Sequence, residues 1–210
     1  MTDMKMALDA CPLVAILRGI SPDEVDAIGD TLIEAGFRVI EVPLNSPQPL
    51  ASIERLARRL GDKAVIGAGT VSRVAQVGEI ASAGGRLIVM PHSDLEIVRA
   101  AKAQGLWCLP GIATPTEAFA ALAAGADGLK LFPAEMIGPP VVKSIRAVLP
   151  REVKLVPVGG ISAGNIPAFW VAGASAFGIG STLYSPGKLA SDVMTSARSL
   201  VEVIDHLRRP

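Results

Sequence analysis

Short apolar runs recur along the chain about every two dozen residues, the spacing of a β-strand followed by a returning helix. Strands that alternate with single helices pair in parallel, because each helix returns the chain to the same end of the sheet. Eight such units predict an α/β protein, a (β/α)₈ TIM barrel, with residues 1–210 as a single domain. The runs are VAILRG (14–19), VIEVPL (39–44), AVIGAG (64–69), RLIVMP (86–91), WCLPGI (107–112), GLKLFP (128–133), KLVPVGG (154–160) and SAFGIG (175–180).

A doubly wound open sheet is the competing architecture, but no G-x-G-x-x-G motif follows the first run. The segments between the runs carry helix signals. Ser21, Ser93 and Thr114 each precede a glutamate by three residues, the pattern of a capping box. Alanine–glycine pairs at 35–36, 83–84, 124–125 and 172–173 predict helix ends, and residues 1–12 predict a short helix or lead-in.

The overall charge and the cysteines restrict the possible partners. Twenty basic residues balance twenty acidic ones, so the charge indicates neither a nucleic acid nor a membrane surface as partner. Residues 155–187 carry no charge, but their prolines and glycines favour strand, loop, helix and strand over a membrane span. Cys11 and Cys108 form no C-x-x-C motif, which argues against a zinc site and a disulfide framework, and for a cytoplasmic protein.

Lys130 is a charged residue inside a predicted buried strand. Because side chains alternate along a strand, Leu129 and Leu131 are expected to face the helices while Lys130 faces inward, and Glu41 on the second strand is expected to face inward too. An ion pair that serves only packing, or a lysine that reaches solvent, is the alternative. A poorly hydrated amine has a lowered pKa and can form a Schiff base, with Glu41 moving protons. This is the chemistry of a class I aldolase.

Polar and glycine residues follow several of the predicted strands, at the end where barrel enzymes hold their active sites. Backbone N–H groups of Gly159, Gly160, Gly180 and Ser181 are expected to bind a phosphate. Arg18, at the end of the first run, can bind a carboxylate or phosphate with two hydrogen bonds; an exposed salt bridge is the alternative.

Five motifs resemble the 2-keto-3-deoxy-6-phosphogluconate and 2-keto-3-deoxy-6-phosphogalactonate aldolases over nearly the whole chain: AILRGI, EVPLNSP, IGAGTV, LKLFPAE and PVGGIS. The resemblance implies a cofactor-free enzyme without a metal, acting on a phosphorylated 2-keto-3-deoxy sugar acid and releasing pyruvate. Lys130 would be the Schiff-base lysine and Glu41 the acid–base residue. Thr70, Pro91 and Phe132 would border the pyruvoyl part of the substrate, with the phosphate near the glycines named above. Members of this family resemble one another in forming homotrimers.

Two positions bear on the sugar epimer. Val158 stands where gluconate-type members have threonine, and Leu44-Asn45-Ser46 stands where they have L-R-T. Both match the galactonate type, so the resemblance implies cleavage of 2-dehydro-3-deoxy-6-phosphogalactonate. Without the arginine of the L-R-T motif, Arg18 would take over anion binding. Without the threonine hydroxyl, a hydrogen bond to the C4 alcohol is lost, and such a loss discriminates strongly between the two epimers. FPAEMIG resembles the gluconate branch instead. The alternatives are a gluconate-specific aldolase, a 4-hydroxy-2-oxoglutarate aldolase, a phosphate-binding barrel isomerase and a non-catalytic barrel.

The uncharged segment around Phe169 and Trp170 is expected to form a helix that exposes an apolar surface. A neighbouring subunit would cover such a surface.

Overall fold

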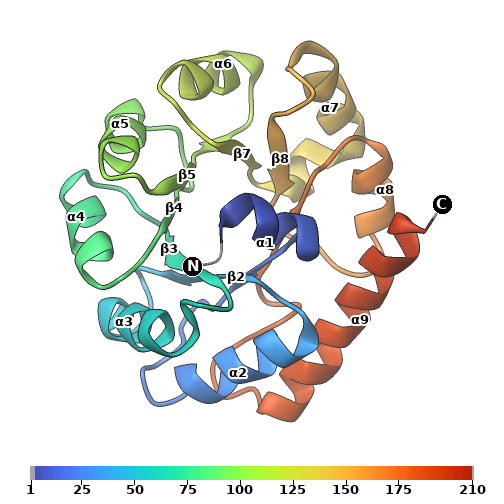
Figure 1. Cartoon of the computed structure of the whole chain (residues 1–210). Coiled ribbons are helices and arrows are strands. Elements are labelled where there is room, and N and C mark those ends of the chain that lie inside the picture. The colour runs from blue at the N-terminus through green and yellow to red at the C-terminus, as the bar shows by residue number, and fades with distance from the viewer. Residues whose placement is uncertain (1–2, 210) are drawn as a thin grey trace.

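The computed structural model describes residues 3–209 and has an α/β fold with parallel strands, as predicted. One sheet has the order β5-β4-β3-β2-β1-β9 and a second has the order β6-β7-β8. The strands lie at the centre and the helices surround them (Figure 1). The strands are β1 (Leu13–Ile16), β2 (Val39–Pro43), β3 (Val65–Gly69), β4 (Leu87–Val89), β5 (Trp107–Leu109), β6 (Gly111–Ile112), β7 (Gly128–Leu131), β8 (Lys154–Pro157) and β9 (Phe177–Ile179). The helices are α1 (Met4–Ala10), α2 (Val25–Ala35), α3 (Pro49–Leu60), α4 (Ala75–Ser82), α5 (Leu95–Ala103), α6 (Pro115–Ala123), α7 (Ala134–Val148), α8 (Ile166–Val171) and α9 (Ala190–Arg208).

The fifth predicted strand is divided into β5 and β6 at Pro110. Proline has no N–H and cannot donate to a sheet ladder, which accounts for the break. Its carbonyl still accepts a hydrogen bond from the Lys130 N–H at 2.9 Å. Backbone contacts also join the two sheets: the Asp127 N–H donates to the Cys108 carbonyl at 3.1 Å, and a parallel bridge pairs Val158 with Gly178.

The predicted helix boundaries are correct in part. Thr114 and Glu117 form the expected capping box of α6, and the glycines at 36, 84, 125 and 173 all adopt positive φ as expected. Two predicted starts are wrong. Asp94, not Ser93, caps α5 because its carboxylate accepts from the N–H groups of Glu96 and Ile97. Residues 21–24 form a turn before α2, which begins at Val25.

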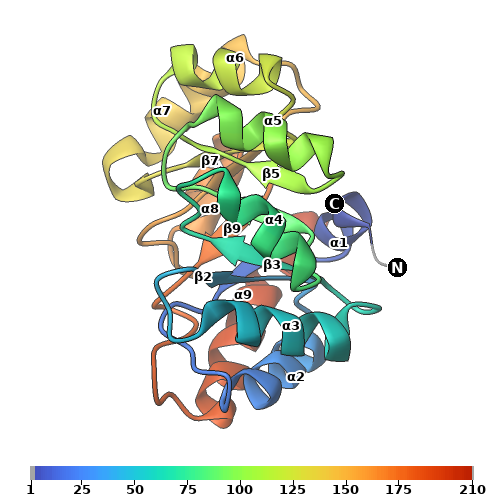
Figure 2. The same cartoon turned by 90° about the vertical axis from the view of Figure 1, so that its left-hand side faces the viewer.

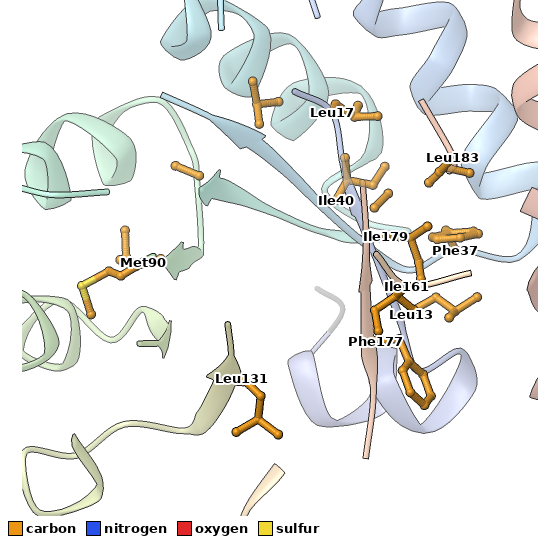
Figure 3. Packing of buried hydrophobic residues seen from close by; sticks show 14 of the residues in the cluster. Leu13, Leu17, Phe37, Ile40, Met90, Leu131, Ile161, Phe177, Ile179 and Leu183 are labelled. Atoms are coloured by element: carbon orange, nitrogen blue, oxygen red, sulfur yellow. The ribbon is translucent and has the colours of Figure 1, made fainter. Parts of the chain in front are cut away.

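Two apolar clusters fill the fold. The outer cluster lies between strands and helices and includes Leu129. Leu131 and the other side chains that are labelled in Figure 3 also belong to it. The inner cluster lies among the strands, and Val39 belongs to it. Since Leu129 and Leu131 lie in the outer cluster, the predicted alternation along β7 is confirmed. Lys130, between them, is therefore directed to the inner side.

Helix α1 covers one end of the inner cluster. It lies over the middle of the strands in Figure 1 and beside one end of them in Figure 2. Met4, Ala7 and Leu8 are buried in the inner cluster. Arg208, the last residue of α9, donates hydrogen bonds to the carbonyls of Ala10 at 2.9 Å and Leu8 at 3.3 Å. Residues 1–2 of the predicted lead-in lie outside the described residues.

The expectation of an exposed apolar surface on the helix around Phe169 and Trp170 is met only in part, because neither aromatic side chain forms that surface. Phe169 is buried in the outer cluster, and Trp170 packs against it and stacks on Phe177 with ring centroids 6.3 Å apart. Their helix α8 instead exposes the neighbouring Val171. No helix in the described part of the chain is long and apolar enough to cross a membrane.

Candidate active site

A cavity of about 490 Å³ opens at the carboxyl ends of the strands. Its lining comes from residues that follow or end β1, β3, β4, β7, β8 and β9. Most of the predicted site residues are brought together here: Arg18, Thr70, Pro91, Phe132, Val158, Gly159, Gly160, Gly180 and Ser181. Lys130, Glu41 and Asn45 are not among the lining residues of this cavity in the described chain.

Lys130 and Glu41 lie next to this lining rather than in it. The two residues are 5% and 2% exposed. The Lys130 Nζ atom lies 4.7 Å from the ring centroid of Phe132, which does line the cavity. Within residues 3–209 no hydrogen bond or ion pair joins Glu41 to Lys130, and Glu41 Oε2 is buried without a hydrogen-bond partner. The alternative, an ion pair between Lys130 and Glu41 that serves only packing, would need a direct contact between the two charged groups. The described part of the structure does not have this contact.

Both ionisable groups are shifted toward their neutral forms. Burial lowers the pKa of Lys130, Arg18 lowers it further, and the charge of Glu41 opposes the shift. Burial raises the pKa of Glu41 to about 7, although Lys130 and Arg18 both favour its ionised form. A carboxyl group with such a pKa can accept and return a proton near neutral pH, and a less basic amine is more often a free nucleophile.

The end of β3 makes room for the Glu41 carboxyl group. A Cβ atom added to Gly69 would overlap the carboxyl carbon and Oε2 of Glu41 and would lie 2.6 Å from Oε1. The next residue, Thr70, has φ of 57°, a left-handed conformation that is unusual for a β-branched residue. Such conformations concentrate at functional sites. Thr70 therefore lines the cavity while its own backbone is in a strained conformation.

Hydrogen bonds hold the loop that carries Arg18. The Arg18 Nη1 atom donates to Asn45 Oδ1 at 2.9 Å, so Asn45 contacts the arginine. The Gly19 N–H donates to Ser46 Oγ at 2.9 Å. Glu24 connects this loop to the one after β9, accepting hydrogen bonds from Ser21 Oγ at 2.8 Å and from the Gly187 N–H at 3.2 Å. Both loops at this edge of the cavity are thereby fixed to each other.

The glycine pair after β8 has left-handed backbone conformations that favour glycine. Gly159 and Gly160 have φ of 110° and 62°. The same cavity is also lined by Gly180, Ser181 and Thr182. Thr182 Oγ1 donates to the Ile161 carbonyl at 2.9 Å and so joins the two loops. The two glycine-containing strand ends predicted to bind phosphate therefore lie on one cavity.

Several lining residues were not predicted from the sequence: Ile16, Glu135, Ile161 and Thr182. Glu135 is the most informative of them. It is the second residue of α7 and lies two residues after Pro133. An acidic residue so soon after a predicted strand was a signal that could have identified it.

Fold and site together define an α/β enzyme, with a cleft at the carboxyl ends of parallel strands and a buried amine and carboxyl group beside it. The family model for KDPG and KHG aldolase matches residues 4–198. The chain belongs to this aldolase family, and both the resemblance and the expected class of carbon–carbon lyase are confirmed.

Individual relatives agree with this assignment. A probable 2-dehydro-3-deoxy-6-phosphogalactonate aldolase of Rhizobium meliloti (strain 1021) is 46% identical over 194 residues, covering 92% of each chain. The 2-dehydro-3-deoxy-6-phosphogalactonate aldolase of Escherichia coli (strain K12) is 44% identical over 191 residues, covering 91% of this chain and 93% of its own. A solved structure described as native KDPGal superposes with a TM-score of 0.92 at 44% identity, covering 93% of this chain and 95% of that one.

Proposed function

We propose that the chain is a class I aldolase that cleaves 2-dehydro-3-deoxy-6-phosphogalactonate to pyruvate and glyceraldehyde 3-phosphate. The observation that carries the proposal is the burial of Lys130 under Phe132, near Glu41 and without an ion pair between the two. The likeness to two aldolases named for this substrate supports it as well.

In the proposed reaction, the neutral amine of Lys130 attacks the C2 carbonyl carbon of the substrate. The resulting carbinolamine loses water and becomes a protonated imine. Glu41, as the carboxylate, takes the proton of the C4 hydroxyl, and the C3–C4 bond breaks with its electron pair moving toward the imine nitrogen. Glyceraldehyde 3-phosphate leaves and an enamine remains. Glu41 returns its proton to the enamine carbon C3, and water then hydrolyses the imine to release pyruvate and the amine.

The lining residues take the remaining roles in the proposal. Thr70, Pro91 and Phe132 border the pyruvoyl part, next to the amine. Arg18 binds an anionic end of the substrate while Asn45 holds the guanidinium in place. The phosphate binds to the backbone of Gly159, Gly160, Gly180 and Ser181. Val158, which is 8% exposed at the edge of the cavity, presents no hydroxyl to C4 and so favours the galactonate epimer.

The proposal extends to the architecture. The backbone contacts between the two sheets support one closed eight-stranded barrel with residues 1–210 as a single domain. Exposed apolar side chains such as Met136, Val148 and Val171 support burial against other subunits in a homotrimer. The unpaired cysteines Cys11 and Cys108 support a reducing, cytoplasmic environment.

Trapping with borohydride tests the proposal. Incubation with pyruvate and borohydride is expected to leave a permanent mass increase on Lys130, located by peptide mass spectrometry, and cleavage of the phosphorylated substrate is expected to be lost in Lys130→Met. Lys154→Met, which removes a half-exposed lysine from the neighbouring strand β8, is the matched control and is expected to keep both. Absence of any adduct on Lys130, or an active Lys130→Met, would exclude the mechanism. Cleavage rates on the galactonate and gluconate epimers decide the substrate.

A further inference from the structure

The side chain of Glu135 lies against the glycine pair at one edge of the cavity. A Cβ atom added to Gly160 would lie 2.7 Å from Glu135 Cγ and 3.0 Å from Oε1, and one added to Gly159 would overlap Oε2. The carboxylate therefore occupies the space directly over the backbone of both glycines. This is the same backbone to which the proposed function assigns the substrate phosphate.

Nothing nearby neutralises this carboxylate. Among the described residues Glu135 makes no hydrogen bond or ion pair, and it is exposed on the cavity surface. The cavity's arginine, Arg18, donates to Asn45 instead. Glu135 lies in the short turn at the start of α7, before the backbone leaves the helical conformation at Gly138, where φ is 63° and ψ is 161°.

We propose that Glu135 determines the charge selectivity of the phosphate end of the site, an inference that rests on the proposed function. Its carboxylate lies over Gly159 and Gly160, and a phosphate can bind there only after the side chain has turned away. The displaced carboxylate remains beside a dianion and repels it. Glu135 thereby weakens binding of the phosphorylated substrate and aldehyde relative to uncharged analogues of the same length.

Glu135→Gln tests this inference, because it keeps the shape of the side chain and removes its charge. Inorganic phosphate, measured as a competitive inhibitor of cleavage, is expected to bind about fivefold more tightly to the variant, as one partly exposed charge pair would predict. The ratio of kcat/KM for the phosphorylated substrate to that for its unphosphorylated analogue is expected to rise by about the same factor. Both differences are expected to shrink at high ionic strength, since salt screens exposed charges.

Glu96→Gln is the matched control. Glu96 is also an exposed carboxylate in the first turn of a helix, α5, but it does not line the cavity. Its substitution changes the net charge in the same way and is expected to leave the phosphate inhibition constant at the wild-type value.

The outcomes separate the inference from the proposed function. If pyruvate and borohydride label Lys130 in the wild type, but Glu135→Gln binds phosphate as the wild type does or more weakly, the inference is wrong and the aldolase mechanism stands. If the label is absent in the wild type, the proposed function fails first. Glu135→Ala, which empties the space over the glycines, must also tighten phosphate binding; weaker binding in that variant would overturn the inference.

Discussion

Gly69→Ala tests whether the position of the Glu41 carboxyl group matters for activity. The added methyl group would occupy the place of the carboxyl carbon and Oε2 of Glu41, which is 2% exposed. Gly69 does not adopt the left-handed conformation, so the effect of the substitution is one of space alone. Overfilling a packed interior costs about 1–3 kcal/mol in the free energy of unfolding.

The effect on activity is expected to exceed the effect on stability. The carboxyl group would have to move by more than about 1 Å to clear the methyl group, and a displacement of about 1 Å at a reacting group already costs on the order of 100-fold in rate. The measurements are kcat for pyruvate release and the free energy of unfolding in urea. Gly78→Ala is the control, because a Cβ there meets only one atom, at 3.9 Å, and alanine in helix α4 is expected to be neutral or stabilising.

A double-mutant cycle identifies the cause. In the background of Glu41→Ala the methyl group no longer meets a carboxyl group, so Gly69→Ala is expected to be less destabilising by about 1 kcal/mol or more. Equal destabilisation in both backgrounds, or a Gly69→Ala variant with wild-type kcat, would refute the reasoning.

Two further predictions concern buried and partly buried charges. The folded-state pKa of Glu41, about 7, lies above its ordinary value of 4.5, so its contribution to stability is present below the ordinary value and lost as the pH rises through 7. Between pH 5 and pH 8 the free energy of unfolding of Glu41→Gln, measured by heat or urea, is therefore expected to rise relative to that of the wild type by up to about 3 kcal/mol. Equal pH dependence of the free energy of unfolding in both proteins would contradict this prediction. Asp127→Asn is expected to cost about 1–3 kcal/mol in urea unfolding, because Asp127 accepts from the partly buried Lys102 at 2.6 Å. Asp9→Asn, which breaks the exposed pair with Lys5, is expected to cost less than about 1 kcal/mol, and similar losses in the two variants would count against this ranking.

The sequence was sufficient for features that depend on local periodicity. Alternation along β7 gave the inward direction of Lys130 because a side chain with apolar neighbours on both sides has only two faces to choose from. The position of the cavity followed in the same way, since parallel strands end together and their last residues must meet.

Other features depend on packing across the molecule and were not accessible from local patterns. The Glu41 carboxyl group lies where a side chain of residue 69, on a third strand, would have been. The position of Glu135 over Gly160 depends on how α7 begins relative to β8. The absence of charges predicted an apolar surface on the helix of Trp170, but could not show that the Trp170 ring stacks on Phe177 of β9.

The positions of helix α1 and of the cavity bear on the order of events in the proposed reaction. Helix α1 packs over one end of the inner cluster, and the cavity opens at the carboxyl ends of the strands. In the proposed reaction the substrate would enter and both products would leave at the carboxyl ends. The pyruvate half would still be bound to Lys130 after bond cleavage, so the aldehyde would be the first product to leave.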